Sequence, residues 1–182
     1  MILWLATGLG VWPLATRAET LQVDPRQSKI EVAVHSTIDS FVAHLDKYQA
    51  NVDCDPAVPL PAKADLSFDF ADLKTGNRDR DTAMLKWLAY DQNPRGTFHL
   101  TGWSQAGTTN IASGQLTIHG VSVPVQMPAT VTHDGTAWDI SGQTTFDYRD
   151  FQLSKIRKLF VLTVDPRLTV TFHLSGQVKA SQ

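Results

Sequence analysis

The residues able to perform acid–base or metal chemistry are scattered along the 182-residue sequence. Six histidines are present, and no two of them have the spacing of a metal-ligand pair. A general acid and base would require folding to bring together two of the dispersed carboxylates Asp53, Asp55, Asp65, Asp69 and Asp72. The sequence has no glycine-rich phosphate loop, paired-cysteine motif, His-Glu-x-x-His or Gly-x-Ser-x-Gly. It therefore predicts no catalytic residue and no metal site.

The densest group of polar residues is the segment 75–81, Thr-Gly-Asn-Arg-Asp-Arg-Asp. One interpretation is a turn and a helix cap, in which Arg80 is bound to a carboxylate and to the backbone. The other is a charged rim that holds the head group of a ligand and consists of Asn77, Arg80 and Asp81. The sequence leaves both interpretations open.

Composition and charge exclude some classes of partner. Sixteen lysines and arginines stand against eighteen aspartates and glutamates, a formal net charge of -2. Such a chain has no electropositive field to hold a nucleic-acid backbone, so we expect no nucleic-acid partner. The single cysteine, Cys54, cannot form an intrachain disulfide, and we expect it to be a half-buried apolar side chain whose further role the sequence does not define.

The first 18 residues have the composition of a secretory leader. They carry an apolar stretch that is uncharged until Arg17, and they end in small residues at Thr16 and Ala18. This pattern predicts a signal peptide that is cut near Ala18 and removed. No later segment offers ~18 consecutive apolar residues. Residues 19–182 are expected to form one exported domain, since the segment shows no internal repeat or long linker.

Alternation of apolar and polar residues dominates the rest of the chain, as is typical of strands with one buried face. It is clearest in 29–35, 65–70, 97–101, 116–118, 121–131, 138–146 and 168–174. The pair His119-Gly120 between two of these segments predicts a tight hairpin turn. About eight or nine such segments predict a meandering antiparallel sheet, which at this size curls into a barrel or splits into a sandwich.

One interval has helical rather than strand spacing. Ala83, Met84, Trp87 and Leu88 recur at three and four residues, which predicts a helix over 79–90. Two aspartates at its start suit the positive end of the helix dipole, and Pro94 limits its length. The segment 37–47 could form either a second short helix or a strand.

Five segments resemble the YceI family of lipocalin-like, polyisoprenoid-binding proteins. They are 23–41, 71–88, 93–98, 114–125 and 146–151, and they cover nearly all of the mature chain in the family's order. The most specific is Gly-Gln-Leu-Thr-Ile-His-Gly-Val-Ser-Val-Pro-Val at 114–125, similar to the family's Gly-x-Leu-Thr-x-x-Gly-Val-x-x-Pro-Val hairpin. The chain departs from the family at 45–48, where many members carry Gly-x-Phe, and at Gln152, where a glycine is usual.

The resemblance implies an all-β, lipocalin-like extended antiparallel eight-stranded barrel with one short helix near residues 79–90. It also implies export to the periplasm and a long apolar tunnel for an isoprenoid chain or a related amphiphile. The residues expected to line this lipid tunnel are Val32, Val34, Phe41, Phe68, Phe70, Leu85, Trp87, Leu88, Phe98, Leu100, Ile118, Met127, Trp138, Ile140, Phe146 and Phe172.

The leading hypothesis is a periplasmic binding or carrier protein for a long-chain lipophilic molecule, such as an isoprenoid quinone, a polyprenyl lipid or a fatty-acid derivative. No cofactor is expected beyond such a non-covalently bound lipid or quinone. One alternative is an enzyme acting on a hydrophobic substrate in the same pocket, with His35, His44 or Arg80 at its mouth. Another is a ligand-free exported stress-response module that acts through surface contacts. Whether a membrane cytochrome, a membrane surface or a second copy is a partner stays open.

Overall fold

The computed structural model describes residues 19–37, 39–158 and 162–178. The predicted signal peptide lies outside the described residues. The strands are β1 (Glu19–Val23), β2 (Lys29–His35), β3 (Ser40–Leu45), β4 (Gln49–Cys54), β5 (Lys63–Asp69), β6 (Leu73–Lys74), β7 (Arg95–Ala106), β8 (Thr109–Ile118), β9 (Val121–Asp134), β10 (Ala137–Asp147), β11 (Arg157–Lys158), β12 (Leu162–Thr163) and β13 (Arg167–Val178). The helix α1 (Arg78–Trp87) and the 3₁₀ turns η1 (Phe70–Asp72) and η2 (Tyr148–Phe151) complete the described part.

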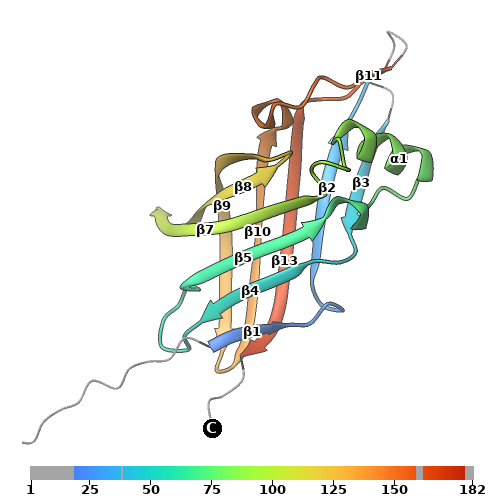
Figure 1. The fold of residues 1–182 in the computed structure, drawn as a ribbon. Helices are drawn as coiled ribbons and strands as arrows, with labels where there is room; N and C mark the ends of the chain where they lie inside the picture. Colours follow the sequence, from blue (N-terminus) through green and yellow to red (C-terminus); the bar gives the residue numbers. More distant parts are fainter. Residues whose placement is uncertain (1–18, 38, 159–161, 179–182) are drawn as a thin grey trace, which may run out of the picture.

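The main sheet closes on itself as an antiparallel barrel. Its strands follow the order β1-β4-β5-β7-β8-β9-β10-β13, and β13 pairs back with β1 through Leu21 and Val178. Three of these strands are split into two segments along the barrel: β1 is followed by β2, β4 by β3, and β5 by β6. The second segments pair in the same order, since β2 pairs with β13, β3 with β2, and β6 with β3. The barrel therefore has eight antiparallel strand positions, which confirms the predicted fold class (Figure 1).

Local sequence explains where the split strands break. Asp24-Pro25 separates β1 from β2, and the Asp24 carboxylate accepts a hydrogen bond from the Arg26 amide at 2.9 Å. Proline fixes φ and lacks an amide donor, so the ladder cannot continue through it. Between β5 and β6, the Asp69 carboxylate accepts from the Ala71 amide at 2.8 Å and starts η1. These breaks let each strand position bend around the barrel.

The predicted hairpin at His119-Gly120 is present and joins β8 to β9. Ile118 pairs with Val121, so the loop has two residues, and both have positive φ, 53° at His119 and 73° at Gly120. Two consecutive positive φ values are typical of a type I′ turn, whose twist matches that of the flanking strands. Along β9 the buried residues are Val125, Met127 and Ala129, with exposed residues between them. This alternation is what the sequence predicts.

The helix begins one residue before its predicted start and ends earlier than predicted. Asn77 caps α1, and its side-chain oxygen accepts hydrogen bonds from the amides of Asp79 and Arg80. The helix ends at Trp87 rather than at residue 90, because Ala89 takes a positive φ of 47°. The second helix candidate, 37–47, contains β3 instead. Pairing with β2 decides this, since it buries Ala43 and Leu45 and leaves Val42 43% exposed.

Two clusters of buried side chains lie inside the barrel. The first cluster centres on Leu21, Val52, Cys54, Trp138 and Val178, from the end where β1 meets β13. The second cluster centres on Phe70, Leu88, Tyr148, Phe151 and Leu153, from the end where α1 and η2 lie (Figure 1). The barrel is thus packed toward both ends. The size and lining of the space between the two clusters determine which ligand the barrel could hold.

Candidate ligand-binding cavity

An internal cavity of about 730 Å³ lies between the two clusters. Val52, Ile140 and Leu174 of the first cluster line it, as do Phe70, Leu88 and Tyr148 of the second. Small-molecule sites in proteins commonly have volumes of roughly 300–1,000 Å³ and mostly apolar walls. This cavity matches that description in size and in lining.

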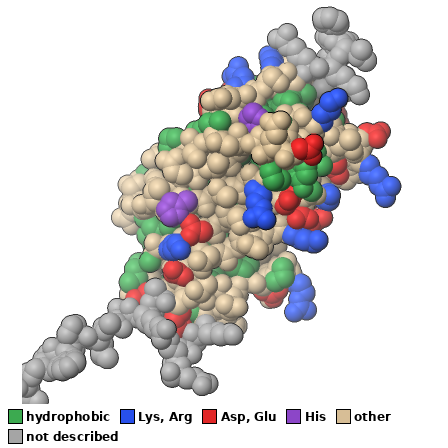
Figure 2. Space-filling view, in the orientation of Figure 1, with side chains coloured by type: hydrophobic (Ala, Val, Ile, Leu, Met, Phe, Trp, Pro, Cys, Tyr) green, Lys and Arg blue, Asp and Glu red, His purple; other side chains and the backbone are tan. Residues whose placement is uncertain are grey.

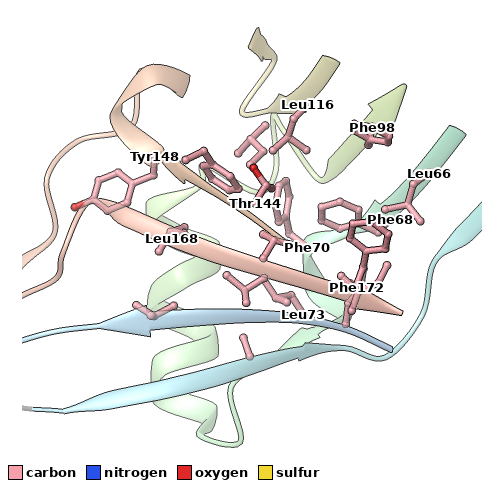
Figure 3. Close-up of a pocket in the computed structure, with 18 of the residues that line it drawn as sticks. Leu66, Phe68, Phe70, Leu73, Phe98, Leu116, Thr144, Tyr148, Leu168 and Phe172 are labelled. Carbon is pink, nitrogen blue, oxygen red and sulfur yellow. The ribbon is translucent and has the colours of Figure 1, made fainter. Parts of the chain in front are cut away.

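Aromatic and aliphatic side chains from different strands converge on the cavity. Figure 3 shows the rings of Phe68, Phe70 and Phe172 grouped together, with Leu116 and Leu168 completing the wall. Phe68 and Phe70 meet edge to face, with ring centroids 5.2 Å apart. These side chains come from β5, η1, β8 and β13, so closure of the barrel is what brings them together. The walls can offer dispersion contacts but few hydrogen bonds.

The sixteen predicted tunnel residues all line the cavity except Leu85 and Trp138. Leu85 packs against the second cluster beside Met84. Trp138 is buried in the first cluster, where its ring stacks on His133 with centroids 4.3 Å apart. The alternation of residues along a strand or helix indicates which side chains face inward. The position of a side chain along the barrel axis decides whether it borders the cavity. Contact between the lining residues and a ligand stays a prediction.

The cavity also has lining residues that the sequence analysis did not name. Ala43, Leu45, Val52, Ala112 and Val125 lie on strands, and strand alternation could have identified them. Leu153, Ile156 and Val164 come from irregular chain around η2 and β12, where no period gives a signal. Tyr148 lies at the start of η2, and its hydroxyl accepts a hydrogen bond from the Ile156 amide at 3.2 Å.

Most of the polar lining residues gather at one end of the cavity, while Asp65 and Thr144 lie elsewhere along it. This polar end consists of Ser36, Asp39, Thr75, Asn77, Asp79 and Arg80. Ser36 and Asp39 lie in the turn after β2, and the other four residues lie just before α1 or in its first turn. Two connecting segments of the chain therefore meet at this end. The Asp39 side chain is 70% exposed, so the polar end reaches solvent. Two predicted rim residues, Asn77 and Arg80, belong to it, and the third, Asp81, does not line the cavity.

Asp81 instead holds the turn before the helix. Its carboxylate accepts hydrogen bonds from the amide and the hydroxyl of Thr75, which is buried. Burial raises the pKa of Asp81, but the hydrogen bonds from Thr75 and the charges of Lys74 and Arg80 outweigh it and lower that pKa below its ordinary value. Asp81 is therefore an anion that is already satisfied within the protein.

Arg80 makes three contacts at the polar end. Nη2 donates to the Thr75 carbonyl at 3.2 Å, and Nη1 lies 3.8 Å from the Asp39 carboxylate. The guanidinium carbon lies 3.7 Å from the centroid of the Phe41 ring, a cation–π distance. Both interpretations of segment 75–81 therefore have a structural counterpart, because a capped helix start also borders the cavity.

The two histidines considered as catalytic groups do not line the cavity. His35 Nδ1 lies 2.9 Å from the Ser40 hydroxyl, and His44 Nδ1 lies 3.4 Å from Glu31, both at exposed positions. Among the residues that the structure describes, no three His, Cys, Asp or Glu side chains are placed to hold a metal ion. Nor does that part of the chain contain a helix long and apolar enough to cross a membrane.

Charge is evenly mixed on the visible surface. Figure 2 shows acidic and basic side chains interspersed over one face, with hydrophobic side chains between them and no broad region of a single sign. On this face, therefore, no broad charged region offers a second candidate binding site.

Comparison with known proteins places this chain in a family. The family model of the YceI-like domain matches residues 21–176. Among solved structures, BcnA of Burkholderia cenocepacia shares 22% identity with a TM-score of 0.74, covering 86% of this chain and 100% of its own. The YceI protein of Campylobacter jejuni shares 21% identity with a TM-score of 0.67, covering 80% and 90%.

A third solved structure is the polyisoprenoid binding domain of Saccharophagus degradans, implicated in plant cell wall breakdown. It shares 15% identity with a TM-score of 0.64, and the match covers 89% of this chain and 99% of that domain. A search of curated proteins gave no match. At these identities the solved structures establish a common fold.

Proposed function

Because this chain belongs to the YceI family, we propose that it binds a long-chain lipophilic molecule, an isoprenoid or a similar lipid, inside its barrel. The supporting observation is the cavity of about 730 Å³ with almost entirely apolar walls. A role in binding and carrying suits this site, because most of the described side chains that line it are apolar. The polyisoprenoid-binding domain of similar fold adds support.

Hydrophobic burial alone supplies enough free energy for such a ligand. Each buried methylene contributes ~0.8 kcal/mol, so about twenty apolar carbons contribute on the order of 16 kcal/mol before losses. Association costs roughly 4 to 15 kcal/mol in lost freedom of motion. Net binding is therefore favourable without a charged clamp. Met84 and Met127, with flexible side chains in the wall, can adapt to an irregular chain.

We place this role in the periplasm, since the leader over 1–18 has the features of a removable signal peptide. Residues 19–182 then act as one exported domain. Such a carrier would exchange its lipid at a membrane surface or with a membrane protein such as a cytochrome, and would serve transport or storage.

Filling the cavity tests this function directly. Ala112 is 4% exposed and lines the cavity from β8, so Ala112→Trp should place an indole where the lipid chain lies. Gln115 is exposed on the same strand, and Gln115→Trp is the matched control. Binding of a fluorescent long-chain fatty-acid probe would be measured by titration, with circular dichroism as a check on folding.

The account expects binding by the natural protein and by Gln115→Trp, and a loss of at least tenfold in affinity for a folded Ala112→Trp, equivalent to about 1.4 kcal/mol or more. Equal binding by all three proteins would place the probe outside the barrel and contradict the proposal.

A further inference from the structure

The cavity ends abruptly between two layers of inward-facing side chains. On three strands, the last side chains to line it toward the end where β1 meets β13 are Val52, Ile140 and Leu174. The next side chains of the first cluster on the same strands, which do not line the cavity, are Cys54, Trp138 and Val178. Each of the second three is at most 3% exposed. This second layer is therefore a floor that fills the barrel beyond the cavity.

Trp138 is the main component of the floor. It is the largest fully buried side chain in the described part of the chain. Its register partner, Gly176, has no side chain, so no opposing side chain competes with the indole for this layer. The ring stacks on His133, and the indole nitrogen has no hydrogen-bond partner among the described residues. Packing, rather than a hydrogen bond, therefore holds the indole in place.

A second tryptophan closes the wall beside the floor. β5 pairs with β7 only over residues 95–99 of β7, so the rest of β7 has no partner in β5. In that part, Trp103 lines the cavity and donates its indole N–H to the carbonyl of the fully buried Pro61 at 2.9 Å. The next residue, Ala62, donates its amide to the Asp53 carbonyl, which places this contact at the level of the floor. The contact thus closes the gap that the short β5 leaves.

Solvent reaches the cavity at the opposite end. The exposed Asp39 belongs to the polar end, and α1 begins there, at the end of the barrel away from β1 (Figure 1). A lipid chain that enters at the polar end therefore runs along the apolar wall until it meets the floor.

The cavity volume sets how much chain fits between the polar end and the floor. An apolar cavity of about 150 Å³ holds one benzene molecule, which corresponds to roughly 25 Å³ for each carbon atom. At that ratio, the cavity of about 730 Å³ accommodates on the order of thirty carbons. An isoprenoid of about six five-carbon units reaches this limit.

We propose that the barrel is a blind tunnel that selects its lipid by chain length, with an upper limit of about thirty carbons, and that Trp138 sets this limit. The inference rests on the proposed function and specifies its substrate class. A longer chain leaves its excess carbons in water, where they contribute nothing to binding. Trp138 is thus a specificity-determining residue that need not contact the head group.

Competition between prenols that differ only in length tests the proposal. Phosphatidylcholine vesicles with equal amounts of prenols of about 15 to 45 carbons would be incubated with the protein, and the lipids bound to the separated protein would be quantified by mass spectrometry. Every chain is fully buried in the vesicle, so uptake reports how much of it the protein also buries. We expect uptake within about tenfold for all chains up to about thirty carbons, and at least a hundredfold lower uptake at about forty.

Two variants should move the limit in opposite directions. Trp138→Val removes roughly seven non-hydrogen atoms from the floor, which makes room for about one more five-carbon unit. Ala50 lines the cavity and packs against the first cluster, so Ala50→Phe should shorten the limit by about one unit. The matched control is Asn51→Phe, at an exposed position of the same strand.

The expected changes are in the uptake ratios of neighbouring lengths. Trp138→Val should raise the uptake of the prenol of about 35 carbons at least tenfold relative to that of about 30. Ala50→Phe should lower the uptake of the prenol of about 30 carbons at least tenfold relative to that of about 25. Asn51→Phe should change neither ratio.

The outcomes separate this inference from the proposed function. Uptake that stays level to the longest prenol, or folded Trp138→Val and Ala50→Phe proteins that keep the natural limit, would overturn the length selection and leave lipid binding intact. Failure to take up any prenol would overturn both. Thermal melts verify folding, and if Trp138→Val does not fold, the limit of Ala50→Phe decides the question.

Discussion

The ring of Phe172 lies directly over Gly142, its register partner on the neighbouring strand. A Cβ atom at Gly142 would come within 2.7 Å of the ring and 2.8 Å of the Pro128 carbonyl oxygen. Phe68 lies over its own register partner, Gly96, in the same way, and a Cβ atom at Gly96 would clash with the Cζ atom of its ring. Both rings line the cavity, so these two glycines determine how far the rings stand from the wall.

Gly96→Ala should therefore narrow the cavity. The three atoms nearest to a Cβ at Gly96 belong to the Phe68 ring, which lines the cavity and can move toward the empty space. We expect lipid affinity to fall about fivefold, equivalent to ~1 kcal/mol, with a small change in Tm. Gly102→Ala on the same strand is the matched control, because no atom lies within 4 Å of its added Cβ. A Gly96→Ala protein with unchanged affinity would contradict this account of the wall.

Gly142→Ala should have a different effect, because its added Cβ also meets backbone. The Pro128 carbonyl cannot move without disturbing β9, so we expect a loss of ~1–3 kcal/mol in the free energy of unfolding. Urea denaturation of Gly142→Ala and Gly96→Ala side by side would measure it. If Gly96→Ala proves the less stable of the two, the distinction between ring and backbone contact is wrong.

Much of the fold could be predicted because strand period and turn chemistry are local. Alternation over 121–131 identified the inward residues of β9, and His119-Gly120 identified its hairpin. The segment 37–47 was ambiguous because Phe41, Val42 and Leu45 fit a helix face as well as a strand. Only pairing with β2 decides it, because the cross-strand hydrogen bonds of that hairpin are not encoded in the spacing of the segment itself.

The sequence could predict which side chains face the barrel interior, but not where along the barrel each of them lies. Trp138 faces inward as its strand phase predicts, yet it fills the first cluster instead of bordering the cavity. Leu153 and Ile156 line the cavity from chain without any period. The contacts of Arg80 could not be predicted at all, since they depend on where Thr75 and Asp39 lie in space.

Trp87 joins α1 to the chain after η2 and borders the cavity. Its indole nitrogen donates to the Ser154 carbonyl at 2.8 Å, and its ring meets Tyr148 edge to face at 5.1 Å. Trp87→Phe keeps an aromatic ring and removes the donor. We expect a loss of ~1 kcal/mol in the free energy of unfolding and faster lipid release, because the helix is held less firmly. Stopped-flow dissociation of a fluorescent lipid would measure the release rate, and an unchanged rate would show that α1 does not limit exit.

Asp147 gives stability a defined dependence on pH. Hydrogen bonds from the Arg149 side chain, at 2.9 Å from Nε, hold the pKa of Asp147 below its ordinary value of 3.8. A carboxylate with a lowered pKa contributes stability that is present above its ordinary pKa and lost as the pH falls through the lowered one. Asp147→Asn should lower Tm by less than about 3 °C at neutral pH, because the pair is partly exposed.

That difference in Tm should stay constant above about pH 5 and shrink as the pH falls below 3.8. Calorimetric scans of both proteins across this range would show it. A difference that grows on acidification would have the wrong sign for this ion pair.

Cys54 should be unreactive in the folded protein. Its side chain is fully buried, and burial, with a further contribution from Asp53, raises the pKa of the thiol to about 12. The thiolate is the reacting form, so a thiol reagent at pH 8 should label Cys54 only after denaturation. Rapid labelling of the native protein would mean that the first cluster opens readily, which its packing around Leu21 and Trp138 argues against.

The central claim is that this barrel holds a lipid in its interior. Native mass spectrometry of protein purified without detergent, followed by organic extraction and identification of what is released, tests it most directly. The account predicts a complex heavier than the polypeptide by the mass of one long-chain lipid. Repeated preparations that show only the bare polypeptide, and that fail to take up added lipid, would contradict it.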